Sequence, residues 1–172
     1  MHLLIRIKLL LLILIVEFVY GNVDISEKKY LLDECKSGNA KSCYKFSKYY
    51  DTCMYNGACS QEYLKIIFKP YKKACEGGIV SACSRLGDMY IFGYGTKRDI
   101  PKGIHIMEQA CKKNDAWACG YMGMVYKWGW LYYKRDYKKA YEYYSKACQL
   151  SNDYNDCKEM NEIKNKLQKL DF

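Results

Sequence analysis

The sequence predicts an all-α protein, a right-handed α/α solenoid of stacked helix pairs with one disulfide in each repeat. Two observations support this fold class. The ten cysteines fall into five close pairs with none left over, and three of these pairs share the spacing C-x7-C. The segments around Ala74-Cys75 and Ala110-Cys111 are near-copies of each other, 36 residues apart. A fixed period with a cysteine pair in each unit indicates a disulfide-bonded repeat protein.

We expect each cysteine to bond to its nearest neighbour in the sequence. The spacing C-x7-C suits a bond from the last turn of one helix to the first turn of the next, and a bond between distant repeats would contradict the solenoid. The predicted disulfides are Cys35–Cys43, Cys53–Cys59, Cys75–Cys83, Cys111–Cys119 and Cys148–Cys157.

The first 21 residues predict export. A basic stretch ending at Lys8 is followed by an apolar run from Leu9 to Val16 and by the small residue Gly21, which is the pattern of a secretory signal peptide. The apolar run is too short to anchor the chain in a membrane. We therefore expect a signal peptide over residues 1–21 and a secreted or periplasmic mature chain over residues 22–172. An even cysteine count in such an oxidising compartment favours disulfides over zinc sites.

No Pro/Ser-rich linker or low-complexity tract divides the mature chain, so we expect one domain. Its expected elements are, in order, a lone helix from Ser26 to Cys35, repeats at about residues 40–76, 79–113 and 115–150, and a polar capping helix from Cys157 to Leu170.

The first helix of each repeat, here called helix A, is indicated by a recurring stripe. In the second repeat, Cys83, Leu86, Gly87 and Tyr90 lie at positions i, i+3, i+4 and i+7, which form one face of a helix. The stripe recurs 36 residues later as Cys119, Met122, Gly123 and Tyr126. The small glycine within it allows a neighbouring helix to approach closely.

The second helix, helix B, begins after a glycine-containing loop. Asp99 is placed to cap it, Pro101 lies in its first turn, and Ile104, Met107 and Cys111 form its buried stripe. Asp136 is expected to cap the helix B of the third repeat in the same way. Gly77-Gly78 marks the tight turn from one helix B to the next helix A.

The units Lys73–Gly95 and Tyr144–Leu150 resemble Sel1-like repeats, which are TPR-like helix pairs, of the cysteine-rich type. More narrowly, the chain resembles the Helicobacter cysteine-rich protein family over residues 31–160. In the first repeat, Ser47 and Cys53 stand where the later repeats have glycine. The resemblance implies an exported, disulfide-bonded α/α solenoid, and it implies penicillin binding or a weak β-lactamase activity, because the family is described in those terms.

The sequence motifs identify no catalytic residue. Two S-x-x-K matches, Ser26 to Lys29 and Ser42 to Lys45, occur about as often as chance predicts, and the S-D-N and K-T-G elements of serine β-lactamases are absent. A catalytic zinc ion needs several histidines, and His105 is the only histidine of the mature chain. We expect no cofactor and no metal.

The net charge of the chain indicates which classes of partner it could bind. The chain has a net charge of +9, but an exported protein without a basic motif of known geometry is a poor candidate for nucleic acid. The excess charge favours an anionic surface of the cell envelope or a host glycan. We expect a monomer, with no stable membrane insertion after signal cleavage.

The primary functional prediction is binding of a peptide, a protein or a cell-wall-type ligand. Helix A residues outside the stripe vary between repeats while the stripe does not, as a ligand surface on a fixed scaffold requires, although a neutral surface shows the same variation. These candidate residues are Lys45, Lys48, Arg85, Asp88, Tyr121 and Met124. Aromatic residues of the loops, namely Tyr94 and those within 128–133, are the next candidates for contacts. The alternative function is a weak β-lactamase or penicillin-binding protein, by resemblance only.

Overall fold

The computed structural model of the chain describes residues 25–49, 51 and 59–170. The predicted signal peptide and the predicted partner of Cys59, Cys53, lie outside the described residues. The described part consists of helices and contains no strand. After a helix over residues 25–36, the helices are α2 (Ala40–Lys48), α4 (Gln61–Glu76), α5 (Val80–Phe92), α6 (Ile100–Lys112), α7 (Ala116–Trp128), α8 (Tyr137–Ser151) and α9 (Tyr154–Leu170).

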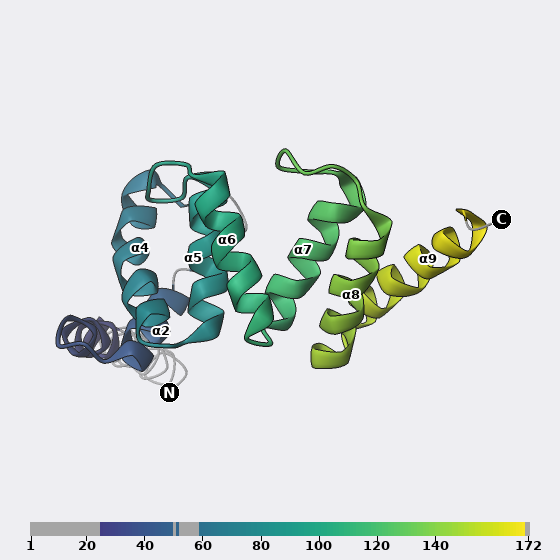
Figure 1. Ribbon diagram of the computed structural model, residues 1–172. Coiled ribbons are helices and arrows are strands. Elements are labelled where there is room, and N and C mark those ends of the chain that lie inside the picture. The colour runs from purple at the N-terminus through teal and green to yellow at the C-terminus, as the bar shows by residue number, and fades with distance from the viewer. Residues whose placement is uncertain (1–24, 50, 52–58, 171–172) are drawn as a thin grey trace, which may run out of the picture.

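The helices form the predicted all-α, right-handed solenoid. Substantial packing between the labelled helices is between those that follow each other in the chain, from α2 against α4 to α8 against α9. Figure 1 shows them as one row that runs from the amino-terminal to the carboxyl-terminal end. None of the helices in the described part is both long and apolar enough to cross a membrane.

Disulfides join each helix B to the following helix A. The bonds are Cys35–Cys43, Cys75–Cys83, Cys111–Cys119 and Cys148–Cys157. They are the nearest-neighbour pairs that the repeat spacing predicts. Cys59 is also disulfide-bonded, and no described cysteine is a free thiol.

The turn after each helix B needs a residue with positive φ. Gly38 and Gly78 supply it at 105° and 88°, and Asn114 takes the same place in the next repeat at 67°. Asparagine is one of the few side chains that tolerates this left-handed conformation. The turn is closed by a hydrogen bond that Ile79 N donates to Ala74 O, and Asp115 N donates to Ala110 O in the same way. Equivalent turns in successive repeats therefore contain the same backbone hydrogen bond.

The caps of helix B are the predicted ones. The Asp99 side chain accepts a hydrogen bond from Lys102 N, and the Asp136 side chain accepts one from Lys139 N. Pro101 lies in the first turn of α6. A side chain that accepts from the second or third amide of a helix satisfies a donor that the helix itself leaves unpaired.

Glycines set the distance between the two helices of a repeat. An added Cβ at Gly103 of α6 would lie 2.6 Å from the backbone oxygen of Gly87 in α5, and one at Gly123 of α7 would lie 2.8 Å from the Tyr144 ring in α8. The predicted close approach at the stripe glycine is therefore present in both repeats.

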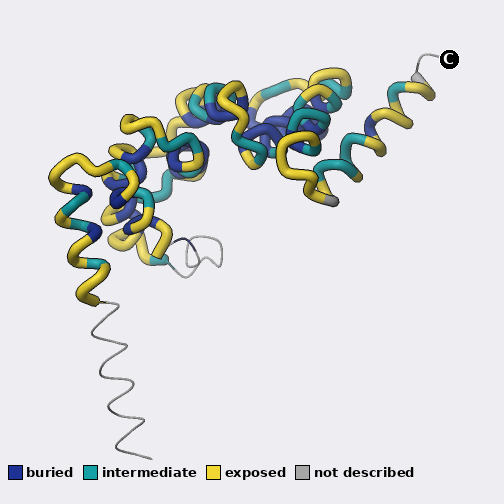
Figure 2. Tube along the Cα trace, turned by 90° about the horizontal axis from the view of Figure 1, so that it is seen from below, coloured by how far each residue is buried: buried dark blue, intermediate teal, exposed yellow. Residues whose placement is uncertain are grey.

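The last helix differs from its prediction in one respect. It begins at Tyr154, three residues before the expected start at Cys157. The reason is Asp153, whose carboxylate accepts hydrogen bonds from the backbone nitrogens of Asn155 and Asp156 and so caps the helix. Figure 2 shows α9 as a largely exposed end of the molecule, and Ile163 is its fully buried contact with the core.

Candidate ligand surface

Successive A-type helices, α2, α5, α7 and α9, are connected by side chains on one face, which we call the helix A surface. Arg85 of α5 reaches Asp51, which follows α2, with Nε 3.9 Å from Oδ2. The same guanidinium lies over the ring of Trp117 in α7, 4.6 Å from its centroid. Lys127 of α7 forms an ion pair with Glu159 of α9. The helix A surface therefore spans all the repeats.

Four of the six predicted surface residues are accessible to solvent. Lys45 and Lys48 are exposed, and both line a hollow beside Tyr44 and Tyr49 at the amino-terminal end. Arg85 is half-buried because it is held between Asp51 and Trp117. Met124 is half-buried on α7.

The prediction that Asp88 and Tyr121 point outward is wrong. Asp88 is 5% exposed and Tyr121 is 9% exposed. A position that faces away from helix B in one repeat faces the seam with the next helix A in the stack, and this seam is where both side chains lie. The spacing of residues along one helix locates the outer face of an isolated helix pair. Stacking of the next repeat then buries one edge of that face.

An aromatic cluster covers the seam between α5 and α7. Its rings, Phe92, Tyr94, Trp117, Tyr121 and Trp130, contact one another with centroid distances of 5.5 to 6.1 Å. Phe92, Trp117 and Trp130 each remain more than a third exposed. Of the loop aromatics considered from the sequence, Tyr94 and Trp130 join this cluster, whereas Tyr132 is 91% exposed.

Sequence reasoning missed Phe92 and Trp117. Both could have been predicted from the sequence, because each lies at helical spacing from a predicted residue. Trp117 precedes Tyr121 by four residues, and Phe92 follows Asp88 by four, so each lies one turn along the same helical face.

A buried carboxylate fixes the position of Arg85. Asp51 is 7% exposed, and its Oδ2 lies 3.0 Å from Lys48 Nζ. Its other oxygen accepts a hydrogen bond from the Tyr71 hydroxyl. Burial and this hydrogen bond hold the pKa of Tyr71 far above its ordinary value. Asp51 is therefore in contact with Lys48, Tyr71 and Arg85, and the Arg85 guanidinium lies between this carboxylate and the ring of Trp117.

Asp88 lacks such pairing. Within the described residues, no side chain donates a hydrogen bond to its carboxylate. Burial raises the pKa of Asp88 to about 6, and the charge of Arg85 opposes this rise. The Tyr121 hydroxyl is also buried without a hydrogen-bond partner in the described part of the chain. Burial, and then the nearby Asp88 charge, raise the pKa of Tyr121. The Tyr121 hydroxyl, which lies near the Asp88 carboxylate, therefore has unused hydrogen-bonding capacity.

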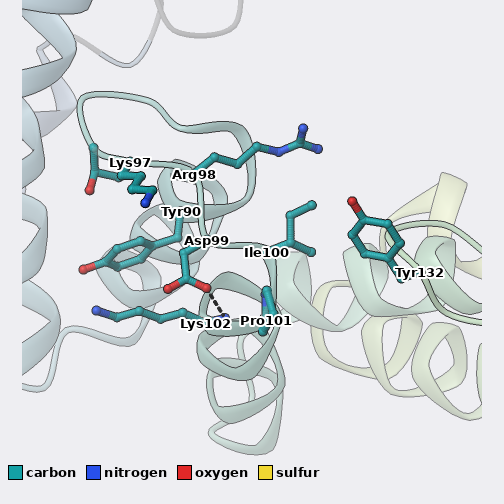
Figure 3. Close-up of a pocket in the computed structure, with 9 residues that line it drawn as sticks. Tyr90, Lys97, Arg98, Asp99, Ile100, Pro101, Lys102 and Tyr132 are labelled. Carbon is teal, nitrogen blue, oxygen red and sulfur yellow. Dashed lines mark hydrogen bonds between the residues drawn. The ribbon is translucent and has the colours of Figure 1, made fainter.

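A separate hollow of about 740 Å³ lies beside the start of α6 (Figure 3). Its lining includes Lys97, Arg98 and Lys102, together with Tyr132 from the next repeat. The Asp99 carboxylate within it is used as the α6 cap. The Lys102 amine lies 4.2 Å from the centroid of the Tyr90 ring. Arg98 donates a hydrogen bond to Ile91 O, so Arg98, Asp99 and Lys102 have structural partners in the fold, and we assign no ligand to this hollow.

The S-x-x-K matches do not show a catalytic arrangement. Ser42 is 5% exposed, and its hydroxyl donates a hydrogen bond to Glu34 Oε2 at 2.7 Å rather than to Lys45. This hydrogen bond lowers the pKa of Glu34, which makes that carboxylate a weaker base. Ser26 is exposed in the first turn of the helix over residues 25–36. The described residues also include no group of three or more histidine, cysteine or acidic residues that could hold a metal ion.

Comparison with known proteins identifies two of the repeats. The family model of the Sel1 repeat matches residues 80–115 and 118–152. Cytochrome c oxidase assembly factor 7A of Xenopus laevis is 35% identical over 60 residues, which are 34% of this chain and 26% of that protein. This chain therefore spans about a quarter of the length of that relative.

Solved structures of similar fold include a Sel1 repeat protein. Helicobacter pylori cysteine-rich protein B has a TM-score of 0.52 at 25% identity and covers 75% of this chain and 88% of its own. A Sel1 repeat protein from Oxalobacter formigenes has a TM-score of 0.56 at 27% identity, with 73% and 54% covered. A protective antigen of uropathogenic Escherichia coli has a TM-score of 0.70, covers 81% of this chain and 28% of its own, and at 22% identity shows the fold alone.

Proposed function

We propose that the chain, whose residues 80–115 and 118–152 match the Sel1 repeat model, is an exported, disulfide-bonded scaffold that binds a peptide or an extended protein segment on its helix A surface. The disulfide-rich solenoid fits a protein-interaction role outside the cytoplasm. The signal-peptide pattern before residue 22 supports export. The aromatic cluster between α5 and α7 is the part of the surface that would hold the ligand.

One observation carries this proposal. At the α5/α7 seam, three partly exposed aromatic rings form one cluster with Tyr121, whose buried hydroxyl lacks a hydrogen-bond partner within the described residues. Aromatic side chains dominate the energy of protein–peptide contacts when they lie near groups that exclude water. The unpaired hydroxyl supplies hydrogen-bonding specificity, because a ligand that pairs it relieves a cost that the free protein bears.

The disulfides also support the proposed binding, because they fix the helices that carry the helix A surface. Each helix A that carries the surface is tied at its first turn to the helix before it, as Cys83 of α5 is tied to Cys75 and Cys119 of α7 is tied to Cys111. A surface that is rigid before binding loses less conformational entropy when the ligand arrives. The staples therefore favour affinity as well as stability.

The alternative function, a weak β-lactamase or penicillin-binding protein, rests on family resemblance. The described geometry offers no observation in its favour, since Ser42 is hydrogen-bonded to Glu34. We therefore do not propose it.

Selection from a random peptide library on the immobilised, oxidised protein tests the proposed function. We expect recovered peptides to bind about 30-fold more weakly to Trp117→Ala and Trp130→Ala, the loss typical of a central contact residue. Trp128→Ala is the matched control, because Trp128 is 60% exposed and lies outside the aromatic cluster. Equal losses in all three variants, or a library that yields no binder, would contradict the proposal.

A further inference from the structure

A hollow of about 280 Å³ lies on the helix A surface where α7 meets α9. Its lining side chains are Trp117, Tyr121 and Met124 of α7, Tyr144 of α8, and Asp156 and Glu159 of α9. Pockets for small molecules typically have volumes of about 300–1,000 Å³. This hollow is slightly smaller, so it suits one side chain of a larger ligand.

The carboxylates at this hollow outnumber the cations that pair with them. Lys127 lies between Glu159 and Glu162 and pairs with both, the latter at 3.6 Å. Asp156 has no ion-pair partner in the described part of the chain. Burial raises the pKa of Asp156, and the charges of Asp153 and Glu159 raise it further. A negative site therefore exists in a chain whose net charge is +9.

The backbone of α7 makes room for this carboxylate. Residue 120 is a glycine, and a Cβ there would lie 2.6 Å from Asp156 Oδ1. Asp156 can therefore lie against α7, within the hollow, instead of turning into solvent. Tyr121 lines the hollow and also belongs to the aromatic cluster through its contact with Trp130, so the hollow is continuous with the surface proposed to bind the peptide.

Trp117 already binds a cation within the protein. The Arg85 guanidinium lies 4.6 Å from the centroid of its ring, a distance at which the electron-rich face of an indole attracts a positive charge. The same ring is 38% exposed and lines the hollow. The hollow thus combines an indole ring that accepts cations with a carboxylate that lacks one.

We propose that the α7/α9 hollow binds the basic side chain, arginine or lysine, of a peptide ligand. This inference rests on the proposed function, since it specifies which peptides the helix A surface accepts. The cationic group lies against Trp117 and pairs with Asp156, and Tyr121 and Tyr144 enclose its aliphatic stem. An acidic side chain is rejected, because it would add a negative charge beside Asp156 and Glu159.

The net positive charge of the protein does not oppose this assignment at contact distance. At physiological ionic strength, interactions between exposed charges are largely screened beyond about 8 Å. The carboxylates that line the hollow therefore decide which side chain it accepts, while the lysines elsewhere affect mainly the rate of encounter.

Titration of the exported, oxidised protein followed by NMR tests the inference. The probes are the blocked tripeptides acetyl-Gly-Arg-Gly-amide, its lysine counterpart and its citrulline counterpart, which has nearly the shape of arginine without the charge. We expect saturable shifts of the Trp117 indole signal with arginine and lysine, and about tenfold weaker binding of citrulline, the loss typical of a charge-assisted hydrogen bond. Asp156→Asn should lower the arginine affinity to a similar extent.

Glu76→Gln is the matched control, because it removes the same charge from an exposed site on α4 where Glu76 pairs with Lys72. The arginine affinity of this variant should be unchanged. Equal binding of arginine and citrulline by the unmodified protein would overturn the inference, even if Asp156→Asn failed to fold. Binding of N-acetylglucosamine oligosaccharides at Trp117, with no binding of the basic tripeptides, would also overturn it and assign the hollow to sugars.

The two proposals fail separately. Library peptides whose binding requires Trp117 but is unaffected by Asp156→Asn, with no preference for arginine over citrulline, would refute the basic side-chain site and leave the peptide-binding scaffold intact. A library without binders would refute the scaffold proposal itself.

Discussion

Asp88 shows how a single residue can connect stability with binding. Its carboxylate is 5% exposed, and burial raises its pKa to about 6. An unfolded chain ionises an aspartate near pH 4, so the folded state binds the proton more tightly than the unfolded state between about pH 4 and pH 6. The free energy of unfolding therefore falls as the pH rises through this window. At neutral pH the folded protein bears the cost of a buried charge.

Asp88→Asn should consequently stabilise the protein at pH 7, by about 1–3 kcal/mol for a pKa difference of about two units. The gain should shrink as the pH falls and nearly vanish at about pH 3.5, where Asp88 is protonated in both states. The neighbouring Tyr121 does not change its charge in this range, because burial raises its pKa. Urea denaturation at the two pH values measures the effect. A gain of equal size at both would show that charge is not its cause.

The candidate residues show what the sequence could and could not predict. Arg85 and Met124 were identified from helical spacing alone, and both lie on the helix A surface. The burial of Asp88 and Tyr121 could not be predicted, because it depends on how one repeat is rotated against the next. Asp156 gave no signal either, since its role arises from the glycine opposite it on α7. Contacts within a repeat follow from local spacing, whereas contacts between repeats require the stacked structure.

At the scale of helices, the recurring glycines predicted the packing of α5 on α6. Gly87 and Gly103 face each other closely enough that a Cβ at Gly103 would also lie 3.0 Å from the backbone nitrogen of Ile91. Both contacts are to backbone atoms, so a side chain at this position moves a whole helix. Gly120 differs, because its nearest neighbour is the carboxylate of a single side chain, Asp156, which can rotate away.

Alanine at these two positions should therefore have opposite effects. Gly103→Ala should lower the free energy of unfolding by about 1–3 kcal/mol through overpacking, which corresponds to a fall in Tm of several degrees. Gly120→Ala should leave Tm unchanged or raise it slightly, because alanine favours a helix by up to about 1 kcal/mol. It should nevertheless weaken binding of the arginine tripeptide, since Asp156 is displaced. Similar thermal shifts for both variants would contradict the assigned contacts.

At the scale of the whole molecule, most of the buried hydrophobic residues that the structure describes form two clusters. The amino-terminal cluster runs from Cys35 to Met89 and the carboxyl-terminal one from Cys83 to Ile163. Cys75 packs against both clusters, and its disulfide partner Cys83 belongs to the larger one. In a solenoid each repeat contacts mainly its neighbours, so cooperative unfolding of the two halves depends on the groups at this junction, which include α5, whose Met89 and Ile91 belong to different clusters. The Cys75–Cys83 disulfide is a covalent link between side chains at this junction.

Replacing both of these cysteines with alanine should therefore separate the unfolding of the two halves. The disulfide closes a loop of about eight residues and contributes about 2.5 kcal/mol by restricting the unfolded chain. All three tryptophans, Trp117, Trp128 and Trp130, lie in the carboxyl-terminal half, so their fluorescence reports that half alone. Circular dichroism reports helices throughout. We expect the two signals to change together during urea unfolding of the unmodified protein.

In the variant, the circular dichroism signal should begin to fall at lower urea than the fluorescence, because the smaller amino-terminal cluster unfolds first. Coincident transitions indicate two-state unfolding, and their separation indicates an intermediate. Removing Cys148 and Cys157 is the matched control, since this disulfide joins α8 to the terminal helix α9 and its loss should lower the midpoint without separating the signals. A Cys75/Cys83 variant whose two curves still coincide would show that packing alone couples the halves, and that the disulfide at the junction only adds stability.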